Sequence, residues 1–234
     1  MRFDPSKLRA VSIDLNGTIL SPSTSVGAIY AEVIKDFGYA LDPEVLQNSF
    51  GVAFKEVNNT RKQDPEKRMD AAFWREVVEG TAAETDGWGA VSDKMFDALF
   101  DTFTEARRWN VRARTFDFLD ALIEKDLKIT FFSNTDARMH TVLKETHLAE
   151  YATKLSLSCD LGYEKPAIEA FRAVQERLDC KPIEILHIGD SLENDGKGSY
   201  KAGWQCALQK SEKTEAQGFP IFTQLEDVLS LFVF

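Results

Sequence analysis

Cysteine is scarce in this chain of 234 residues. There are only three, Cys159, Cys180 and Cys206, an odd number without the spacing of a metal site. This excludes a disulfide framework and favours free thiols in a reducing compartment. Cys159 and Cys206 fall in apolar, strand-like runs, which predicts that both are buried.

The chain also lacks an excess of basic residues and any long apolar run. Lys and Arg number 28 against 38 Asp and Glu, so the formal net charge is −10. Such a chain offers no positive field to nucleic acid or anionic lipid. No apolar run approaches the about 18 residues of a membrane span, and the start, MRFDPSKLRA, is polar. We therefore expect a cytoplasmic protein with neither nucleic acid nor membrane as partner.

From about Pro22 to Trp109 the pattern is helical, with no convincing strand, and two connecting strands are expected near 20–23 and 109–113. Three apolar stripes recur at helical spacing, at 26–37, 69–77 and 95–103, and Gly38 and Gly80 are expected to end the first two helices. Such faces must pack on one another, which predicts a small helical bundle.

Elsewhere, short apolar runs alternate with amphipathic helices, which indicates a parallel sheet covered on both faces. Strands are predicted at 128–133, 155–160, 185–189 and 204–208, with the run at 10–13 joining them. A peripheral strand at 219–222 and a last helix at 225–231 would follow. The fold class is then α/β, with a Rossmann-like core of residues 1–21 and 112–234 and a helical cap of residues 22–111 inserted after the first strand.

The segment AVSIDLNGTIL (10–20) is the strongest motif. A buried run ends on Asp14 and is followed by a turn at Gly17-Thr18, which places the carboxylate at the C-terminal edge of the sheet. Open α/β folds bind ligands at this edge. Three later segments end apolar runs with polar residues in the same way: FFSNTD (131–136), Lys165-Pro166 and IGDSLENDG (188–196).

In this order, the four segments resemble those of the haloacid dehalogenase-like (HAD) superfamily of aspartate-nucleophile hydrolases, in the subfamily with a helical cap. FGVAFKEV and FWREVV are in addition faintly similar to the relatives called haloacid dehalogenase-like hydrolase domain-containing protein 3. The resemblance implies a Mg²⁺-dependent phosphatase that acts on a small phosphorylated metabolite through an aspartyl-phosphate intermediate. Neither the substrate's identity nor the oligomeric state follows from these residues.

The resemblance also assigns roles. Asp14 would be the nucleophile, and Mg²⁺ would be held by Asp14, Asp190 and the main-chain carbonyl of Asn16, with Asp195 binding it through water or orienting a ligand. The phosphate would be bound by the turn at Leu15 and Asn16 and by Ser133, Asn134 and Lys165. Physically, a carboxylate attacks an anionic phosphate only where a cation and backbone N–H groups offset the repulsion.

Asn16 departs from the family pattern, because the phosphatases carry a second aspartate there that protonates the leaving oxygen. Asparagine neither gives nor takes a proton at physiological pH. Four explanations stay open: a weakened or specialised phosphatase; a non-catalytic relative that binds a phosphorylated ligand or a protein; an Asp→Asn variant or an Asn-Gly pair that has not deamidated; and a sibling chemistry. The siblings are haloacid dehalogenation, which the retained Asp190 and Asp195 disfavour, and phosphonate hydrolysis through a cap lysine such as Lys55.

Residues 50–58 are predicted to form a specificity loop of the cap, from which Lys55 and Arg61 would reach the substrate. A solvated basic side chain is an equally good interpretation of either. His187, inside its strand, is interpreted as a packed histidine. His140 and His147 are placed on a helix without the spacing of a zinc site.

Overall fold

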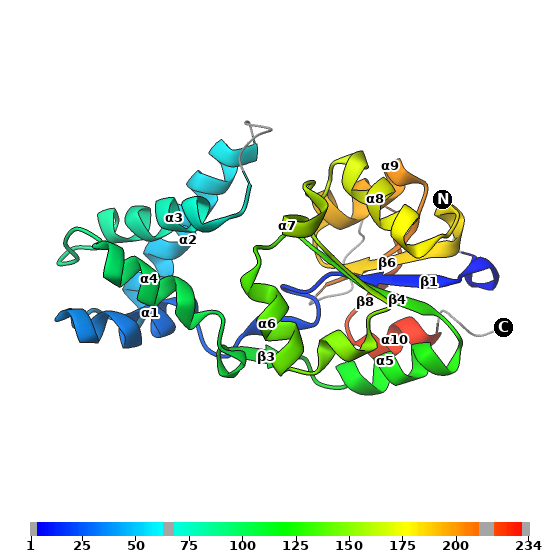
Figure 1. The fold of residues 1–234 in the computed structure, drawn as a ribbon, viewed down its shortest axis with the longest axis horizontal. Helices are drawn as coiled ribbons and strands as arrows, with labels where there is room; N and C mark the ends of the chain where they lie inside the picture. Colours follow the sequence, from blue (N-terminus) through cyan, green and yellow to red (C-terminus); the bar gives the residue numbers. More distant parts are fainter. Residues whose placement is uncertain (1–3, 63–67, 211–217, 231–234) are drawn as a thin grey trace. The chain divides into compact units, whose positions relative to one another are not determined.

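The computed structural model describes residues 4–62, 68–210 and 218–230. The chain divides into two compact units (Figure 1). An α/β unit comprises Met1–Ser21, Val111–Asn134 and Thr146–Phe234, and a helical unit comprises Pro22–Asn110 and Thr135–Glu145.

A six-stranded sheet in the order β5-β4-β1-β6-β7-β8 forms the centre of the α/β unit, and neighbouring strands pair in parallel. The strands are β1 (Ala10–Ile13), β4 (Lys128–Ser133), β5 (Lys154–Leu157), β6 (Ile185–Gly189), β7 (Gln205–Gln209) and β8 (Ile221–Phe222). The chain extends from β1 to β4 and β5, then continues on the other side of β1 with β6. The strand order therefore reverses between β1 and β6, which is where open α/β sheets bind ligands. The α/β, Rossmann-like fold class is confirmed.

The central strands are buried on both faces because helices cover both sides of the sheet. All residues of β1 and β6 are buried, as are five of the six residues of β4. The predicted strands at 128–133 and 185–189 are confirmed residue for residue. The predicted strand at 155–160 is wrong in its second half: it ends at Leu157, and helix α7 (Ser158–Leu161) follows.

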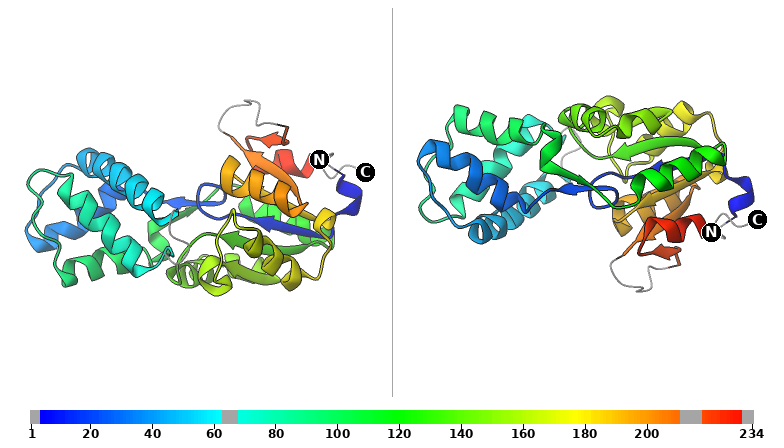
Figure 2. Two further views of the ribbon diagram at one scale, coloured as in Figure 1. Left: turned by 90° about the horizontal axis from the view of Figure 1, so that it is seen from above. Right: turned by 90° about the horizontal axis from the view of Figure 1, so that it is seen from below.

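Helices α8 (Ile168–Leu178) and α9 (Gly198–Ala202) lie on one face of the sheet, and α5 (Thr115–Glu124) and α10 (Leu225–Leu229) lie on the other (Figures 1 and 2). Phe171 of α8 packs edge-on against Phe132 of β4 and against Trp204, with ring centroids 5.1 Å apart in both pairs. Residue 231, the expected end of the last helix, lies outside the described residues.

Short helical segments connect these elements. They are η1 (Pro5–Lys7), η4 (Leu148–Tyr151), η5 (Pro182–Glu184) and the π-helical η6 (Leu192–Lys197) in the α/β unit, and η2 (Lys35–Phe37) and η3 (Ala106–Arg108) in the helical unit. Where the chain passes between the units, β2 (Leu20–Pro22) pairs with β3 (Trp109–Val111) in a separate two-stranded sheet.

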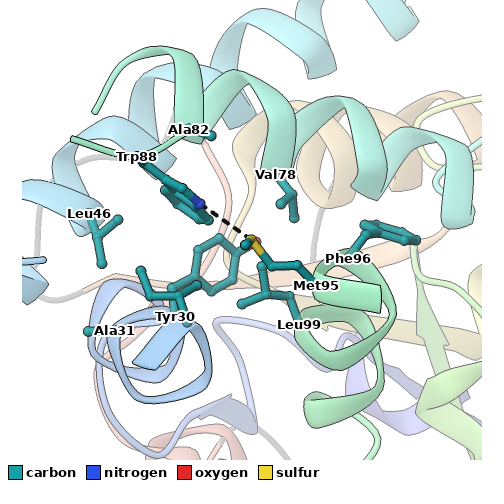
Figure 3. Close-up of a cluster of buried hydrophobic side chains, with 10 residues drawn as sticks. Tyr30, Ala31, Leu46, Val78, Ala82, Trp88, Met95, Phe96 and Leu99 are labelled. Atoms are coloured by element: carbon teal, nitrogen blue, oxygen red, sulfur yellow. Dashed lines mark hydrogen bonds between the residues drawn. The ribbon is translucent and has the colours of Figure 1, made fainter. Parts of the chain in front are cut away.

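The helical unit contains α1 (Val26–Ile34), α2 (Pro43–Lys62), α3 (Ala71–Ala83), α4 (Asp93–Thr102) and α6 (Arg138–Glu145). Side chains of Ser25, Asp70 and Ser92 accept hydrogen bonds from the first turns of α1, α3 and α4, which satisfies amide groups that a helix leaves unpaired. Figure 3 shows the buried cluster inside this unit, where the indole N–H of Trp88 points at the sulfur of Met95, 3.4 Å away.

Two expectations for this unit are wrong. Gly80 does not end a helix but lies inside α3, where a Cβ would come 3.1 Å from the Cβ of Ala53; its small size lets α3 approach α2 closely. Residues 50–58 form no loop, because they belong to the 20-residue helix α2. Gly38, with a left-handed φ of 85°, does follow the first helical run as expected.

Residues 135–145 group with the helical unit, although the sequence placed them in the α/β part. The cause is a buried polar cluster. Asp136 accepts a hydrogen bond from the indole N–H of Trp74 at 2.7 Å and is paired with Arg138. Arg138 donates to the backbone carbonyl of Phe100 at 2.7 Å, and its guanidinium lies 3.6 Å from the centre of the Phe100 ring. These contacts attach the start of α6 to α3 and α4.

The three cysteines are free, and Cys180 and Cys206 are buried. Cys159 is exposed, which contradicts the expectation for it, because it lies on α7 rather than on a strand. Among the described residues, no helix combines the length and the apolar character needed to cross a bilayer.

Candidate active site

Three polar residues of the α/β unit lie at the carboxyl ends of adjacent strands. Asp14 follows β1, Ser133 is the last residue of β4, and Asp190 follows β6. The backbone N–H of Asp14 donates to the carbonyl of Ile188 at 2.8 Å, which continues the pairing of β1 with β6 up to the carboxylate. Asp14 and Ser133 are both buried. The sheet thus brings together residues separated by up to 176 positions in the sequence.

Lys165 is buried between two carboxylates. Its Nζ lies 2.9 Å from Asp14 Oδ1 and 2.7 Å from Asp195 Oδ1. Although burial alone would lower the pKa of Lys165, the two carboxylates raise it above its ordinary value, so the ammonium form is retained. This places a fixed positive charge against the proposed nucleophile.

The side chain of Asn134 holds the backbone of Lys165 in place. Its Oδ1 accepts from the Lys165 N–H, and its Nδ2 donates to the Lys165 carbonyl, each at 2.8 Å. The side-chain amide of Asn134 thus joins the end of β4 to the loop that carries the lysine. The contact expected between Asn134 and the phosphate stays a prediction.

Asp195 lies on η6, and its carboxylate is engaged in three hydrogen bonds. Oδ1 accepts from Lys165 and from Nε2 of His187, the latter at 2.9 Å, and Oδ2 accepts from the Ser191 N–H at 2.9 Å. Burial acts to raise its pKa, but Lys165 and His187 outweigh this and hold the pKa of Asp195 well below its usual range. These bonds fix the orientation of the Asp195 carboxylate. Its two expected roles, binding Mg²⁺ through water and orienting a ligand, stay predictions.

Asp14, Asp190 and Asp195 offer carboxylate oxygens that all lie within 4.8 Å of one another. Burial and the neighbouring carboxylates raise the pKa values of Asp14 and Asp190, although Lys165 opposes this. Three carboxylates against one ammonium leave an excess of negative charge. Hard oxygen donors with excess negative charge suit a divalent cation such as Mg²⁺, which Asp14 and Asp190 would hold.

The turn after Asp14 requires glycine at position 17 for two reasons. Gly17 has a φ of 86°, which L side chains rarely adopt, and a Cβ there would come 2.8 Å from Asp190 Oδ2. The carbonyl of Leu15 accepts hydrogen bonds from the backbone N–H groups of Thr18, Ile19 and Leu20, so the turn is closed on itself. The side chain of Leu15 is buried, and Asn16 is exposed.

Several residues that support this site escaped sequence reasoning. Arg112 donates from its backbone to Ile19 and from its guanidinium to the carbonyls of Thr18, at 3.3 Å, and Thr223, at 3.0 Å. Lys210 donates to the carbonyl of Asp190 at 2.6 Å. These bonds all join segments distant in sequence, so no local pattern signals them.

For Gly189 and His187, by contrast, the alternation of side chains along the strand could have indicated that both lie near Asp195. Alternate residues of a strand face the same side, so His187 and Gly189 share one face of β6. A Cβ on Gly189 would lie 2.3 Å from Asp195 Cγ, so the carboxylate packs directly on the glycine backbone. A polar residue two positions earlier is therefore in reach of Asp195.

Lys55 and Arg61 both lie on α2 of the helical unit. Lys55 is exposed, whereas Arg61 is buried, donates to Asn58 Oδ1 at 2.8 Å and lies 5.5 Å from the centre of the Phe73 ring. Arg61 therefore packs within its own unit. His147 lies outside α6, contrary to expectation, and its Nδ1 is 2.7 Å from Glu150.

The geometry defines a doubly wound α/β protein with an acidic, lysine-containing site at the point where the strand order reverses. The model of the haloacid dehalogenase-like hydrolase family matches residues 8–203, and the chain belongs to this family. It is a hydrolase of that family by sequence and by fold.

Individual relatives agree with this assignment. An uncharacterized hydrolase of Schizosaccharomyces pombe is 27% identical over 86% of this chain and 90% of its own length. The haloacid dehalogenase-like hydrolase domain-containing protein 3 of Danio rerio is 25% identical over 80% of this chain and 79% of its own, which confirms the likeness seen in the sequence. The ribulose-1,5-bisphosphate 5-phosphatase of Halopiger xanaduensis is 24% identical over 88% of this chain and 87% of its own length.

Among solved structures, the HAD hydrolase YfnB of Bacillus subtilis, determined with bound magnesium, superimposes with a TM-score of 0.77. It covers 96% of this chain and 98% of its own, at 19% sequence identity. At this identity the likeness establishes the fold.

Proposed function

We propose that this protein is a Mg²⁺-dependent phosphatase in which Asp14 attacks a small phosphate monoester, and that Asn16 slows its turnover of poor leaving groups. The observation that carries the proposal is the position of Asp14. Its carboxylate lies 2.9 Å from the Lys165 ammonium and within 4.8 Å of the carboxylates of Asp190 and Asp195. An ammonium ion beside a nucleophile offsets the repulsion of a phosphate dianion.

In the proposed reaction, a carboxylate oxygen of Asp14 forms a bond to phosphorus while the bond from phosphorus to the leaving oxygen breaks, and the leaving group departs with that electron pair. Lys165 neutralises charge on the nucleophile and the phosphoryl oxygens, and Ser133 can donate its hydroxyl to one of these oxygens. A bound Mg²⁺ would supply further neutralisation of that charge. Water then attacks the phosphorus of the aspartyl phosphate, the bond from phosphorus to the Asp14 oxygen breaks, and inorganic phosphate is released with the Asp14 carboxylate restored.

Asn16 has consequences for the leaving group. General acid–base catalysis contributes about 10²–10⁴ in rate, and an asparagine supplies none of it. Alkoxide leaving groups depend on such a proton, whereas a nitrophenolate, or the carboxylate expelled from an acyl phosphate, leaves without one. The expected substrate is therefore a small phosphorylated metabolite with a good leaving group.

The comparisons support a phosphatase in two ways. One relative is named as a sugar-bisphosphate phosphatase, and a structural neighbour carries magnesium. The acidic cluster also argues against dehalogenation. That reaction is an attack on carbon without a metal ion, so no cation would balance the charge of Asp190. In this proposal the helical unit serves as the cap, with Lys55 of α2 as an exposed cation that could select the substrate.

A second candidate, a protein that binds a phosphorylated ligand without turning it over, is favoured by Asn16 alone. Substitution Asn16→Asp distinguishes the two. We expect the wild type to hydrolyse p-nitrophenyl phosphate with Mg²⁺ but not with EDTA, and Asn16→Asp to raise kcat for an alkyl phosphate by about 10²–10⁴, with a much smaller gain for the nitrophenyl ester.

Two variants serve as controls. Asn48→Asp adds the same charge at an exposed position of α2 and should change neither rate. Asp14→Ala should abolish hydrolysis. Full activity of Asp14→Ala would end the nucleophile assignment, and an unchanged rate in Asn16→Asp would favour the binding protein.

A further inference from the structure

His187 is wholly buried at the centre of β6 and surrounded by aromatic rings. The ring centroids of Phe132, Phe171 and Trp204 lie 5.6, 6.1 and 6.4 Å from that of the imidazole. Burial and the charge of Lys165 lower the pKa of His187 below its ordinary value, although Asp195 opposes this. A packed histidine would need no more than this environment, but this one also makes two specific hydrogen bonds.

Both ring nitrogens have partners, and together they select one tautomer. Nε2 lies 2.9 Å from Asp195 Oδ1, and Nδ1 lies 2.9 Å from the hydroxyl of Ser12, which is directly opposite on β1. A neutral imidazole carries one N–H, and an ionised carboxylate only accepts. The proton therefore belongs on Nε2, and the Ser12 hydroxyl, which can rotate, donates to Nδ1.

The oxygen that accepts from His187 is also the one that holds Lys165. Asp195 Oδ1 receives Nζ of Lys165 at 2.7 Å and Nε2 of His187 at 2.9 Å. Since Asp195 also packs on the backbone of Gly189, its carboxylate is restrained from two sides. Without the imidazole N–H, only the lysine itself would orient Oδ1.

We propose that His187 is a positioning residue: its Nε2–H, with the tautomer fixed by Ser12, holds Asp195 where that carboxylate shares Lys165 with Asp14. The role in turnover rests on the proposed phosphatase function. The role in the geometry does not, because it concerns a hydrogen-bond chain within the α/β unit that runs from Ser12 to Asp14.

A matched pair of variants tests the role in turnover. The amide nitrogen of a glutamine reaches about as far as Nε2, whereas that of an asparagine reaches about as far as Nδ1. Both remove the aromatic ring, so both lose its packing. We expect His187→Asn to lower kcat about 10–100-fold with KM little changed, as for other residues that orient a functional group from behind it. His187→Gln should recover most of this loss.

A second measurement is independent of activity. In ¹⁵N NMR spectra of the wild type near neutral pH, Nε2 of His187 should resonate as a protonated ring nitrogen and Nδ1 as an unprotonated one. Ser12→Ala should weaken this preference. A wild type with the proton on Nδ1, or equal kcat values in the Gln and Asn variants, would overturn the proposal. If the wild type hydrolyses no phosphate ester, the proposed function fails, and the tautomer alone still decides the geometric assignment.

Discussion

Replacing Asp190 by asparagine should affect stability in opposite directions with and without metal. The carboxylate of Asp190 receives a long hydrogen bond from Thr18 Oγ1, at 3.4 Å. Within the described part of the chain, Lys165 forms an ion pair with Asp14 but not with Asp190. Burial and the charge of Asp195 raise its pKa, although Lys165 opposes this. Burying the ionised carboxylate of Asp190 thus lowers the stability of the folded protein, and an isosteric neutral amide removes this unfavourable free energy.

The sign follows from proton linkage. A carboxyl group whose pKa is raised by folding binds its proton more tightly in the folded state. Its contribution to stability is therefore present at low pH and is lost as the pH rises from the unfolded value of about 3.9 through the raised folded value. Above that window, in EDTA, we expect Asp190→Asn to be at least as stable as the wild type.

Magnesium should reverse the order. A ligand present at 100 times its dissociation constant stabilises a folded protein by about 2.7 kcal/mol. For a chain of this size, about 2–4 °C per kcal/mol converts this to a rise in Tm of about 5–11 °C. The wild type should show that rise, and Asp190→Asn should lose most of it because one of two carboxylate ligands is gone.

Calorimetry is the suitable assay, because the two units can unfold in separate transitions and only that of the α/β unit should respond. Potassium chloride at matched ionic strength controls for screening, and Asp97→Asn, an exposed change on α4, should respond to Mg²⁺ as the wild type does. A metal-free Asp190→Asn that is less stable than the wild type would refute the charge argument. Equal Mg²⁺ shifts in both proteins would place the cation elsewhere.

Two further predictions concern the same site. Gly189→Ala should destabilise the protein by about 1–3 kcal/mol in urea unfolding and abolish any phosphatase activity, since the new Cβ would lie 2.3 Å from Asp195 Cγ. As a control, Gly51→Ala, in α2 with open space around it, should stabilise the protein by about 0.5–1 kcal/mol. A Gly189→Ala protein more stable than the Gly51→Ala protein would contradict the packing. Asp195→Asn should cost about 1–3 kcal/mol at pH 7 through its bonds to Lys165 and His187. Because folding depresses the pKa of Asp195, this stability is present above pH 4 and is lost as the pH falls, so the urea midpoints of wild type and variant should converge in acid, and a gap that stays constant would refute the linkage.

Strand positions were predictable where burial on both faces left a short, mostly apolar run. ILHIG and KITFFS have sharp ends because a polar residue, Asp190 or Asn134, follows each of them. Residues 155–160 misled the prediction because Ser158 and Cys159 suit a strand as well as a helix, and only the tertiary structure decides that α7 begins there. Gly80 misled it because glycine serves close packing as well as helix ends.

For the site, the sequence predicted that Asp14, Ser133 and Asp190 would meet at the sheet edge, since their motifs end β1, β4 and β6. Lys165 ends no strand, because it lies in the loop between α7 and α8. The sequence did not predict what holds these side chains there. Asn134 binds the backbone of Lys165, and Arg112 binds the turn after Asp14, through contacts between segments that no short motif records. Residues 135–145 were misplaced for the same reason, because Asp136 is bonded to Trp74 of α3, 62 positions away.

These supports bear directly on Asn16. The turn that carries it is closed by the Leu15 carbonyl, permitted by Gly17 and held by Arg112, and none of these contacts involves the side chain of residue 16. The ion pairs of Lys165 are equally independent of it. Because the described contacts of the site do not involve this exposed side chain, asparagine in place of the family's aspartate leaves the nucleophile, the lysine and the acidic cluster undisturbed. The expected effect of Asn16 is therefore confined to proton transfer, which is why a single substitution should separate binding of a phosphate ester from its turnover.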